Sequence, residues 1–362
     1  MGYDKKVGTV LEDPSQQAIF IRKVVNDMCH MISNFPKNSR VIFVKDSKSW
    51  RKSIPIENGG YKSSRKKDEG VDWSVFYQLF DKFGEVLEER GVIYSKCDGA
   101  EGDDLAFIWS RFLNSRNENC VIISGDADLT QLVSKSNDGR GWTIQWTSNA
   151  KNDNIYVPEG FFSGSRDQII KPKTIFDMSI LVEDDDMKFL NKLSEGRNVV
   201  EIDPKIVSFR KILQGDDGDS VPSVWEKQNA SGKRVRLSDG KYNKIVETLS
   251  RSEYSDSLSE ELFNDEKYQE YISGLILRIF GDTDNSENRS KVVENISRNM
   301  YLVWLNKNVI PKEIVMEVIE SALDKIDGSS LNIVWDRIKF LEGTEWEKHV
   351  LPKEQDPFKY MN

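Results

Sequence analysis

The chain has 362 residues, 38% of them hydrophobic and 31% charged, with a formal net charge of −9, which suits one large or two smaller globular domains. It contains two histidines, which counts against a Ser-His-Asp or Cys-His mechanism and against a His-rich zinc site. Its three cysteines lack metal-type spacing, so they indicate a reduced, cytoplasmic compartment, and no apolar run is long enough to span a membrane.

The first part of the chain alternates between helical and strand-like segments. Apolar spacing predicts helices over 18–32, 72–91 and 102–113, and buried strands over 40–46, 92–95, 120–124 and 142–147, with a short helix after the third strand. Such alternation is typical of an α/β domain with a parallel sheet, which we expect over residues 1–160.

The second part, residues 161–362, is expected to be a mainly helical domain. Helical spacing is found over 203–215, 241–250, 266–281, 290–305 and 312–326, and the polar stretches 226–240 and 282–289 are expected to be connectors. We find no internal repeat.

Acidic residues follow three of the predicted strands. Asp46 ends the first, "AEGDD" supplies Glu101, Asp103 and Asp104 after the second, and Asp126 and Asp128 follow the third. One such acid would be explained as a helix cap, but the carboxyl ends of parallel strands meet at one edge, so three occurrences predict a shared metal site. Carboxylates suit Mg²⁺ or Mn²⁺, and two such ions about 3.5–4 Å apart are a common device for phosphodiester hydrolysis.

The ordered motifs "VIFVKD", "YKSSR", "AEGDD", "SGDADLTQL" and "LQGDDGDSVPSV" resemble the flap-endonuclease and 5′-nuclease superfamily. Within it, the chain is most similar to the T-even bacteriophage ribonuclease H branch. The resemblance spans roughly residues 18–225. It implies a PIN-like nuclease domain followed by a helical domain with a helix–three-turn–helix element near 203–225.

The resemblance also implies roles for individual residues. Asp46, Glu101, Asp103, Asp104 and Asp126 would hold a first Mg²⁺ or Mn²⁺ ion or its water shell, and Asp128, Asp216 and Asp219 would serve a second. In the basic arch, residues 51–70, Tyr61 would stack on a base, Lys62 and Arg65 would hold the scissile phosphate, and Lys66 would contact DNA. In the turn, Gly215, Gly218 and Ser220 would grip duplex phosphates, with a K⁺ ion there. The alternatives are a solvated loop for the arch and an ordinary Gly-Asp connector for the turn.

The family begins with a buried strand that ends in a metal-binding Asp. Neither Asp4 nor Asp13 in "MGYDKKVGTVLEDPSQQ" fits that pattern, because the helix expected from residue 18 follows Asp13 too soon. We therefore expect the first strand to be missing, either by truncation or as a natural variation.

The function that the resemblance implies is a divalent-metal-dependent 5′-3′ nuclease that hydrolyses RNA primers and DNA flaps at their 5′ ends in phage-type DNA replication. The alternative is a catalytically weakened protein of the same fold that binds DNA structures. The expected partners are branched or 5′-flap DNA and RNA–DNA duplex, together with a single-stranded-DNA-binding protein and a sliding clamp. We expect a monomer in the host cytoplasm, without membrane contact.

Overall fold

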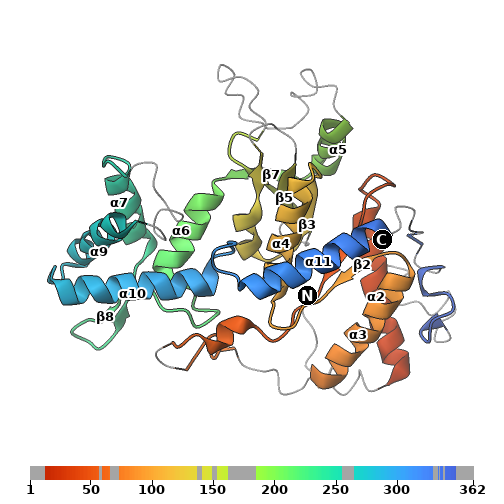
Figure 1. The fold of residues 1–362 in the computed structure, drawn as a ribbon, viewed down its shortest axis with the longest axis horizontal. Helices are drawn as coiled ribbons and strands as arrows, with labels where there is room; N and C mark the ends of the chain where they lie inside the picture. Colours follow the sequence, from red (N-terminus) through yellow and green to blue (C-terminus); the bar gives the residue numbers. More distant parts are fainter. Residues whose placement is uncertain are drawn as a thin grey trace.

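The structure is a computed structural model that describes residues 13–56, 59–65, 73–136, 141–148, 153–161, 185–254, 265–328, 333, 335–336 and 339–347. Figure 1 shows strands β3 (Cys120–Ile123), β5 (Trp142–Ser148) and β7 (Asn198–Ile202) in the middle of the molecule. Helices α2 (Pro14–Ile32) and α3 (Trp73–Glu89) lie on one side, and α6 (Pro204–Gln214), α7 (Asp239–Leu249), α9 (Glu266–Phe280) and α10 (Ser286–Val303) lie on the other.

The predicted elements of the first half are present, with shifted boundaries. They are α2 (Pro14–Ile32), β1 (Ile42–Val44), α3 (Trp73–Glu89), β2 (Ile93–Ser95), α4 (Gly102–Ser115), β3 (Cys120–Ile123) and the 3-10 helix η2 (Ala127–Leu132). The 3-10 helix η1 (Trp50–Ser53) was not predicted. Helix α2 begins four residues before the predicted start, because Asp13 accepts a hydrogen bond from the Ser15 backbone N–H and Pro14 suits the first helical position.

The strands of the first half do not form the single parallel sheet that was predicted, because they divide into a two-stranded parallel sheet and a separate mixed sheet. Strands β1 and β2 pair in parallel, and a larger sheet has the order β3-β5-β6-β7, in which β3–β5 and β6–β7 are parallel and β5–β6 is antiparallel. Its later strands are β4 (Ser134–Lys135), β5 (Trp142–Ser148), β6 (Asp153–Pro158) and β7 (Asn198–Ile202). The α/β class is confirmed, but β6, β7 and the antiparallel pairing were not predicted, and β7 comes from beyond the expected boundary at residue 160.

The second half is mainly helical, as predicted. Its helices are α5 (Asp185–Ser194), α6 (Pro204–Gln214), α7 (Asp239–Leu249), α9 (Glu266–Phe280), α10 (Ser286–Val303) and α11 (Lys312–Gly328), followed by the 3-10 helix η4 (Lys339–Leu341). One predicted connector contains a short hairpin of β8 (Lys227–Gln228) and β9 (Arg234–Val235), and α10 starts inside the other.

One apolar core lies within the second half of the chain, and another joins the two halves. Helices α6, α7, α9 and α10 bury one core, built around Phe209, Tyr268 and Ile296. Helix α11 lies against α4 (Figure 1), and Ile314 and Val318 are buried with side chains of α4. In the described part of the chain, no helix is both long and apolar enough to cross a membrane.

Candidate functional site

Acidic side chains follow the C-terminal ends of three strands. Asp46 follows β1, and its Oδ1 accepts a hydrogen bond of 2.6 Å from the Gly102 backbone N–H at the start of α4. Asp126 follows β3 and caps η2 by accepting from the Asp128 backbone N–H at 2.9 Å. The hydrogen bond from Gly102 to Asp46 fixes the end of β1 to the start of α4, the helix that carries the "AEGDD" acids.

Asp103 lies at the centre of this acid cluster. Burial and the negative charges of Asp126, Glu101, Asp128 and Asp46 raise the pKa of Asp103 to about 7. Burial is the largest cause, and the like charges add to it, because both make ionisation of a carboxyl unfavourable. The use of these acids as metal ligands stays a prediction.

Glu101 and Asp104 both contact Arg51, a cation that was not among the predicted site residues. Arg51 is 2% exposed and donates to both Asp104 oxygens, at 2.8 and 2.7 Å, and to Glu101 at 3.2 Å. Asp104 is fully buried and also accepts from the Trp50 indole at 3.2 Å and from the Glu101 backbone N–H at 3.1 Å. The structure therefore places Asp104 in a buried ion pair with Arg51.

A second group of acids forms around Lys211 on α6. The Lys211 ammonium pairs with Asp128 and with Asp216, the latter at 2.8 Å. Burial raises the pKa of Asp128 in spite of this contact. Burial also acts on Asp216, but the hydrogen bond and charge of Lys211 outweigh it and lower the pKa of Asp216. Lys211 thus joins an acid of the "SGDAD" motif to an acid of the "GDDGDS" turn.

The "GDDGDS" turn is held by its own backbone and by one carboxylate. Asp216 and Val221 form a two-way backbone bridge, with N–H···O distances of 2.9 and 2.7 Å. The Asp216 side chain accepts from the Gly218 backbone N–H at 2.8 Å. Gly215 has φ +71°, and a Cβ there would lie 2.4 Å from the Val221 carbonyl oxygen, so only glycine fits.

Part of the basic arch packs directly on this turn, in a contact that we call the clasp, between residues 61–65 and 217–220. The Lys62 backbone N–H donates to the Asp219 carbonyl at 2.7 Å, and the Ser64 backbone N–H donates to the Ser220 hydroxyl at 2.8 Å. The two hydroxyl oxygens of Ser64 and Ser220 are 2.7 Å apart. Lys62 and Ser220 both have positive φ values, 59° and 61°, so both sides of the clasp hold strained backbone.

The clasp also brings the arch side chains onto the acids. Lys62 pairs with Glu101 and lies 3.9 Å from Asp219, and Arg65 pairs with Asp219. Burial opposes the ionisation of Glu101, but the hydrogen bond and charge of Lys62 hold its pKa below the ordinary value. The predicted phosphate-binding cations thus lie beside the predicted metal-binding acids.

Tyr61 is placed differently from the expected base-stacking residue. It is 7% exposed, and its hydroxyl lies 3.0 Å from a Glu101 oxygen and 3.1 Å from an Asp219 oxygen. In this conformation its ring is buried rather than presented to solvent, so base stacking would require the clasp to open. Lys66 lies outside the described residues.

The acids do not form a ready-made coordination cage. Within the described ranges, no three Asp, Glu, His or Cys side chains are grouped so that they could hold one metal ion. Several carboxylates are instead bound by Arg51, Lys62, Arg65 and Lys211. In donor chemistry the cluster fits a hard divalent cation, but these ion pairs would have to rearrange to admit one.

Comparison with protein families matches residues 9–162 to the 5′-3′ exonuclease N-terminal resolvase-like domain. The match begins before Asp13, so the segment preceding α2 is part of the domain, although the residues before Asp13 lie outside the described part. A comparison with curated proteins gave no match.

Similar solved structures include the bacteriophage T5 flap endonuclease in a pseudo-enzyme-product complex with DNA and metal ions, at 16% identity and a TM-score of 0.46, covering 86% of this chain and 91% of that one. A mutant of the T5 5′-exonuclease matches at 14% identity and a TM-score of 0.44, covering 88% and 96%. The narrower resemblance to the T-even ribonuclease H stays a prediction. Residues 9–162 are thus similar to the N-terminal resolvase-like domain of 5′-3′ exonucleases.

Proposed function

We propose that the protein is a divalent-metal-dependent 5′-3′ nuclease of the flap-endonuclease and RNase H type, acting at the 5′ ends of RNA primers and DNA flaps in phage-type replication. The observation that carries the proposal is the crowding of carboxylates around Asp103, next to the arch cations Lys62 and Arg65. Like charges repel in such an acid cluster unless a cation is bound. Metal ions and fixed positive charges together stabilise the transition state of phosphodiester hydrolysis.

Asp46, Glu101, Asp103 and Asp126 are the residues that we propose for a first Mg²⁺ or Mn²⁺ ion, and Asp128, Asp216 and Asp219 for a second. When bound, the ions would neutralise the cluster and supply an activated water. Asp104 is a less suitable ligand, because Arg51 holds both its oxygens in a fully buried pair. We assign it the role of fixing the start of α4, and thereby the position of Asp103.

The arch cations would act on the substrate. In the clasp, Lys62 and Arg65 neutralise Glu101 and Asp219. Once the proposed metal ions neutralise the carboxylates, a scissile phosphate that enters the cluster would be a stronger partner for these cations. Lys62 and Arg65 would then orient the phosphate and stabilise the charge that grows on it during hydrolysis.

The turn at residues 215–221 is the proposed site for the duplex part of the substrate. Its geometry keeps Gly215, Gly218 and Ser220 close to the surface between α6 and the following segment. Backbone N–H groups in such a turn can bind phosphates without reading sequence, with a K⁺ ion between them. A single-stranded-DNA-binding protein and a sliding clamp are the further partners that we propose from the superfamily resemblance.

Asp13 is our proposed counterpart of the acid that ends the family's first strand. The family match starts at residue 9, and α2 begins directly after Asp13 rather than at residue 18. The test is Asp13→Asn, because asparagine preserves the helix cap while it removes the charge. We expect weaker Mn²⁺ binding with an unchanged melting temperature in EDTA; unchanged Mn²⁺ binding would contradict the assignment and favour a missing first strand.

The decisive experiment is cleavage of a 5′-labelled flap substrate with Mg²⁺ or Mn²⁺, comparing the natural chain with Asp126→Asn. We expect short 5′ products from the natural chain only, and none in EDTA. Binding of the flap without any cleavage would reject the nuclease proposal. It would favour the alternative, a protein that binds DNA structures without cleaving them. The ion pairs between the acids and lysines support that alternative, because they occupy carboxylates that a metal ion would need.

A further inference from the structure

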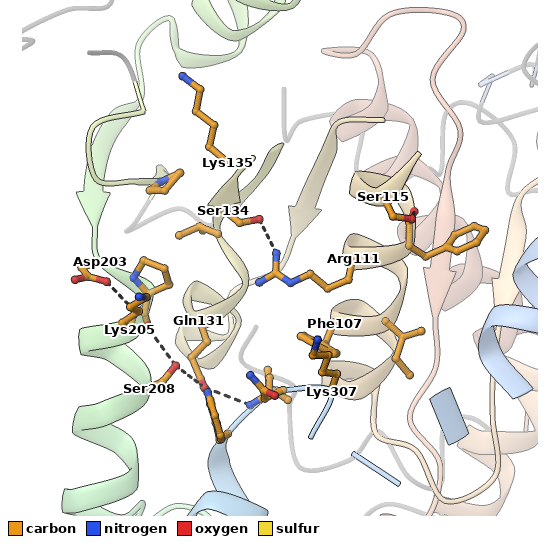
Figure 2. Close-up of a pocket in the computed structure, with 18 of the residues that line it drawn as sticks. Phe107, Arg111, Ser115, Gln131, Ser134, Lys135, Asp203, Lys205, Ser208 and Lys307 are labelled. Carbon is orange, nitrogen blue, oxygen red and sulfur yellow. Dashed lines mark hydrogen bonds between the residues drawn. The ribbon is translucent and has the colours of Figure 1, made fainter. Parts of the chain in front are cut away.

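A cavity of about 960 Å³ lies apart from the acid cluster, between the two halves of the chain. Its walls are α4, the segment from η2 to β4, the start of α6, and the connection from α10 to α11 (Figure 2). None of the acids proposed for metal binding lines it. Its volume is in the range of small-molecule sites, which often lie between domains.

The cavity is basic although the chain is acidic. Arg111, Lys135, Lys205 and Lys307 line it, against only two acidic residues, Glu159 and Asp203. Asp203 caps α6 by accepting from the Lys205 backbone N–H at 2.8 Å. Within the described ranges no ion pair joins either acid to a lining cation, so the positive charge is not neutralised locally.

Arg111 is the most informative of these cations. It reaches from α4 towards Ser134, whose hydroxyl accepts from Nη1 at 2.5 Å (Figure 2). Ser134 donates in turn to the Asn114 side-chain oxygen at 3.3 Å, so its oxygen is oriented as an acceptor for Arg111. The Phe107 ring lies 5.5 Å from the guanidinium carbon. The cation is thus positioned by a hydroxyl and a ring face, and no carboxylate in the described part of the chain pairs with it.

Arg111 lines the cavity with most of its donors unused by the described part of the chain. A guanidinium has five N–H groups, and the hydrogen bond to Ser134 uses one of them. Burial lowers the pKa of Arg111, and no ion pair with a carboxylate of the described residues offsets that effect. Withdrawn cations in proteins are normally paired, and the fork of an arginine suits a phosphate held by two parallel hydrogen bonds.

Apolar side chains form another part of the lining. Phe112 of α4, Trp304 of the α10–α11 connection and Ile319 of α11 line the cavity with the cations. A ligand that satisfies both kinds of wall carries an anionic group and a flat, weakly polar part, which describes a nucleotide better than inorganic phosphate.

We propose that this cavity is a nucleotide-binding site in which Arg111 holds the phosphate and the apolar wall accepts the base or sugar. The nucleotide is either a free 5′-mononucleotide or a terminal unit of a nucleic-acid strand, and the shared chemistry is a phosphate ester joined to a base. The site does not rest on the proposed nuclease function, because its residues are separate from the acid cluster.

The test is calorimetric titration of the full chain in EDTA with AMP, inorganic phosphate, adenosine and a short single-stranded oligonucleotide. EDTA removes divalent ions, so the acid cluster cannot bind phosphate through a metal. We expect AMP or the oligonucleotide to bind at least about tenfold more tightly than phosphate or adenosine, since each part contributes its own contacts. Whichever of the two binds identifies the source of the phosphate.

Arg111→Gln should weaken that binding at least about tenfold, the effect of losing charge-assisted hydrogen bonds. Lys307→Gln, at an exposed position of the same cavity, should weaken it without affecting folding. Arg251→Gln is the matched control, because Arg251 is exposed and pairs with Glu247 outside the cavity. Equal binding by Arg111→Gln and Arg251→Gln would overturn the proposal, and so would binding of inorganic phosphate as tight as that of AMP, or no binding of either nucleotide ligand.

Discussion

Replacement of Asp103 by asparagine should stabilise the metal-free protein and abolish its response to Mn²⁺. Asp103 has a pKa of about 7 because burial and the charges of Asp126, Glu101, Asp128 and Asp46 oppose its ionisation. At pH 8 the folded state must nevertheless hold it as a carboxylate. Asparagine has nearly the same shape and no charge, so the substitution removes this repulsion.

The magnitude follows from the difference between the folded pKa of about 7 and the ordinary value of 3.8. This difference corresponds to about 4 kcal/mol of lost stability once both states are ionised. Asp103 also lies in the first turn of α4, where a negative charge interacts favourably with the helix dipole by about 0.3–1 kcal/mol. The repulsion is larger, so we expect a net gain of about 3 kcal/mol at pH 8, or a melting temperature about 4 °C higher for a chain of this length.

The sign of the pH dependence is fixed by the raised pKa. Below about pH 4 the group is protonated in both the folded and the unfolded state, and it costs nothing. As the pH rises from about 4 to 7, the unfolded state ionises first, and the folded state loses stability. The natural chain should therefore lose stability from this group over that window, and Asp103→Asn should lose less.

The assay is thermal unfolding in EDTA at several values between pH 5 and 8, repeated at pH 8 with Mn²⁺. Asp324→Asn is the matched control, since Asp324 is exposed on α11. We expect Mn²⁺ to raise the melting temperature of the natural chain and the control but not that of Asp103→Asn. A melting temperature of Asp103→Asn equal to or below that of the control at pH 8 would refute the electrostatic reasoning.

Three further outcomes are expected. In the double variant Ser64→Cys with Ser220→Cys, a disulfide across the clasp should block flap cleavage until a reductant is added. Either single variant should cleave the flap with and without the reductant. Cleavage by the oxidised double variant would show that the clasp need not open. Gly215→Ala should lower the free energy of unfolding in urea by more than about 1 kcal/mol and weaken duplex binding. The reasons are the positive φ of Gly215 and the 2.4 Å distance between the added Cβ and a backbone oxygen. Gly218→Ala, whose added Cβ would have its nearest contact at 3.2 Å, should have a much smaller effect. Arg51→Gln should cost about 3–5 kcal/mol in the same urea unfolding, since it leaves a buried carboxylate unpaired; a loss under 1 kcal/mol would argue against that ion pair.

Periodicity predicted the helices and the strand ends well, because both depend on local patterns. The apolar spacing of 266–281 and 312–326 located α9 and α11 to within a few residues. Strands β6 and β7 were missed, since "DNIYVP" and "NVVEI" are short and lie in polar surroundings. Their pairing joins residues about 44 positions apart, such as Ile155 with Val199, and no local signal reports such a partner.

The strand-end rule accounts for only part of the acid cluster. It fits β1 and β2, which pair in parallel and are followed by Asp46 and the "AEGDD" acids, but β3, which Asp126 follows, lies in a separate sheet. The charge effect of Asp126 on Asp103 links the two sheets, and the assignment of these acids as metal ligands stays a prediction. The clasp could not be inferred in this way. It joins residues more than 150 positions apart through side chains and strained backbone, as between Ser64 and Ser220.

The cations that pair with the acids show the same limit most clearly. Lys211 appears in the sequence as one polar residue of an amphipathic helix, and its only local signal is a separation of five residues from Asp216. Its contact with Asp128 depends on how α6 packs against η2, which is a property of the folded chain. Ordered acid motifs therefore predict where a cation is needed, whereas only the tertiary structure shows that Lys211 and Lys62 now meet that need. For the proposed nuclease, it follows that metal binding and clasp opening are linked through Lys62, because each requires its ammonium group to leave Glu101.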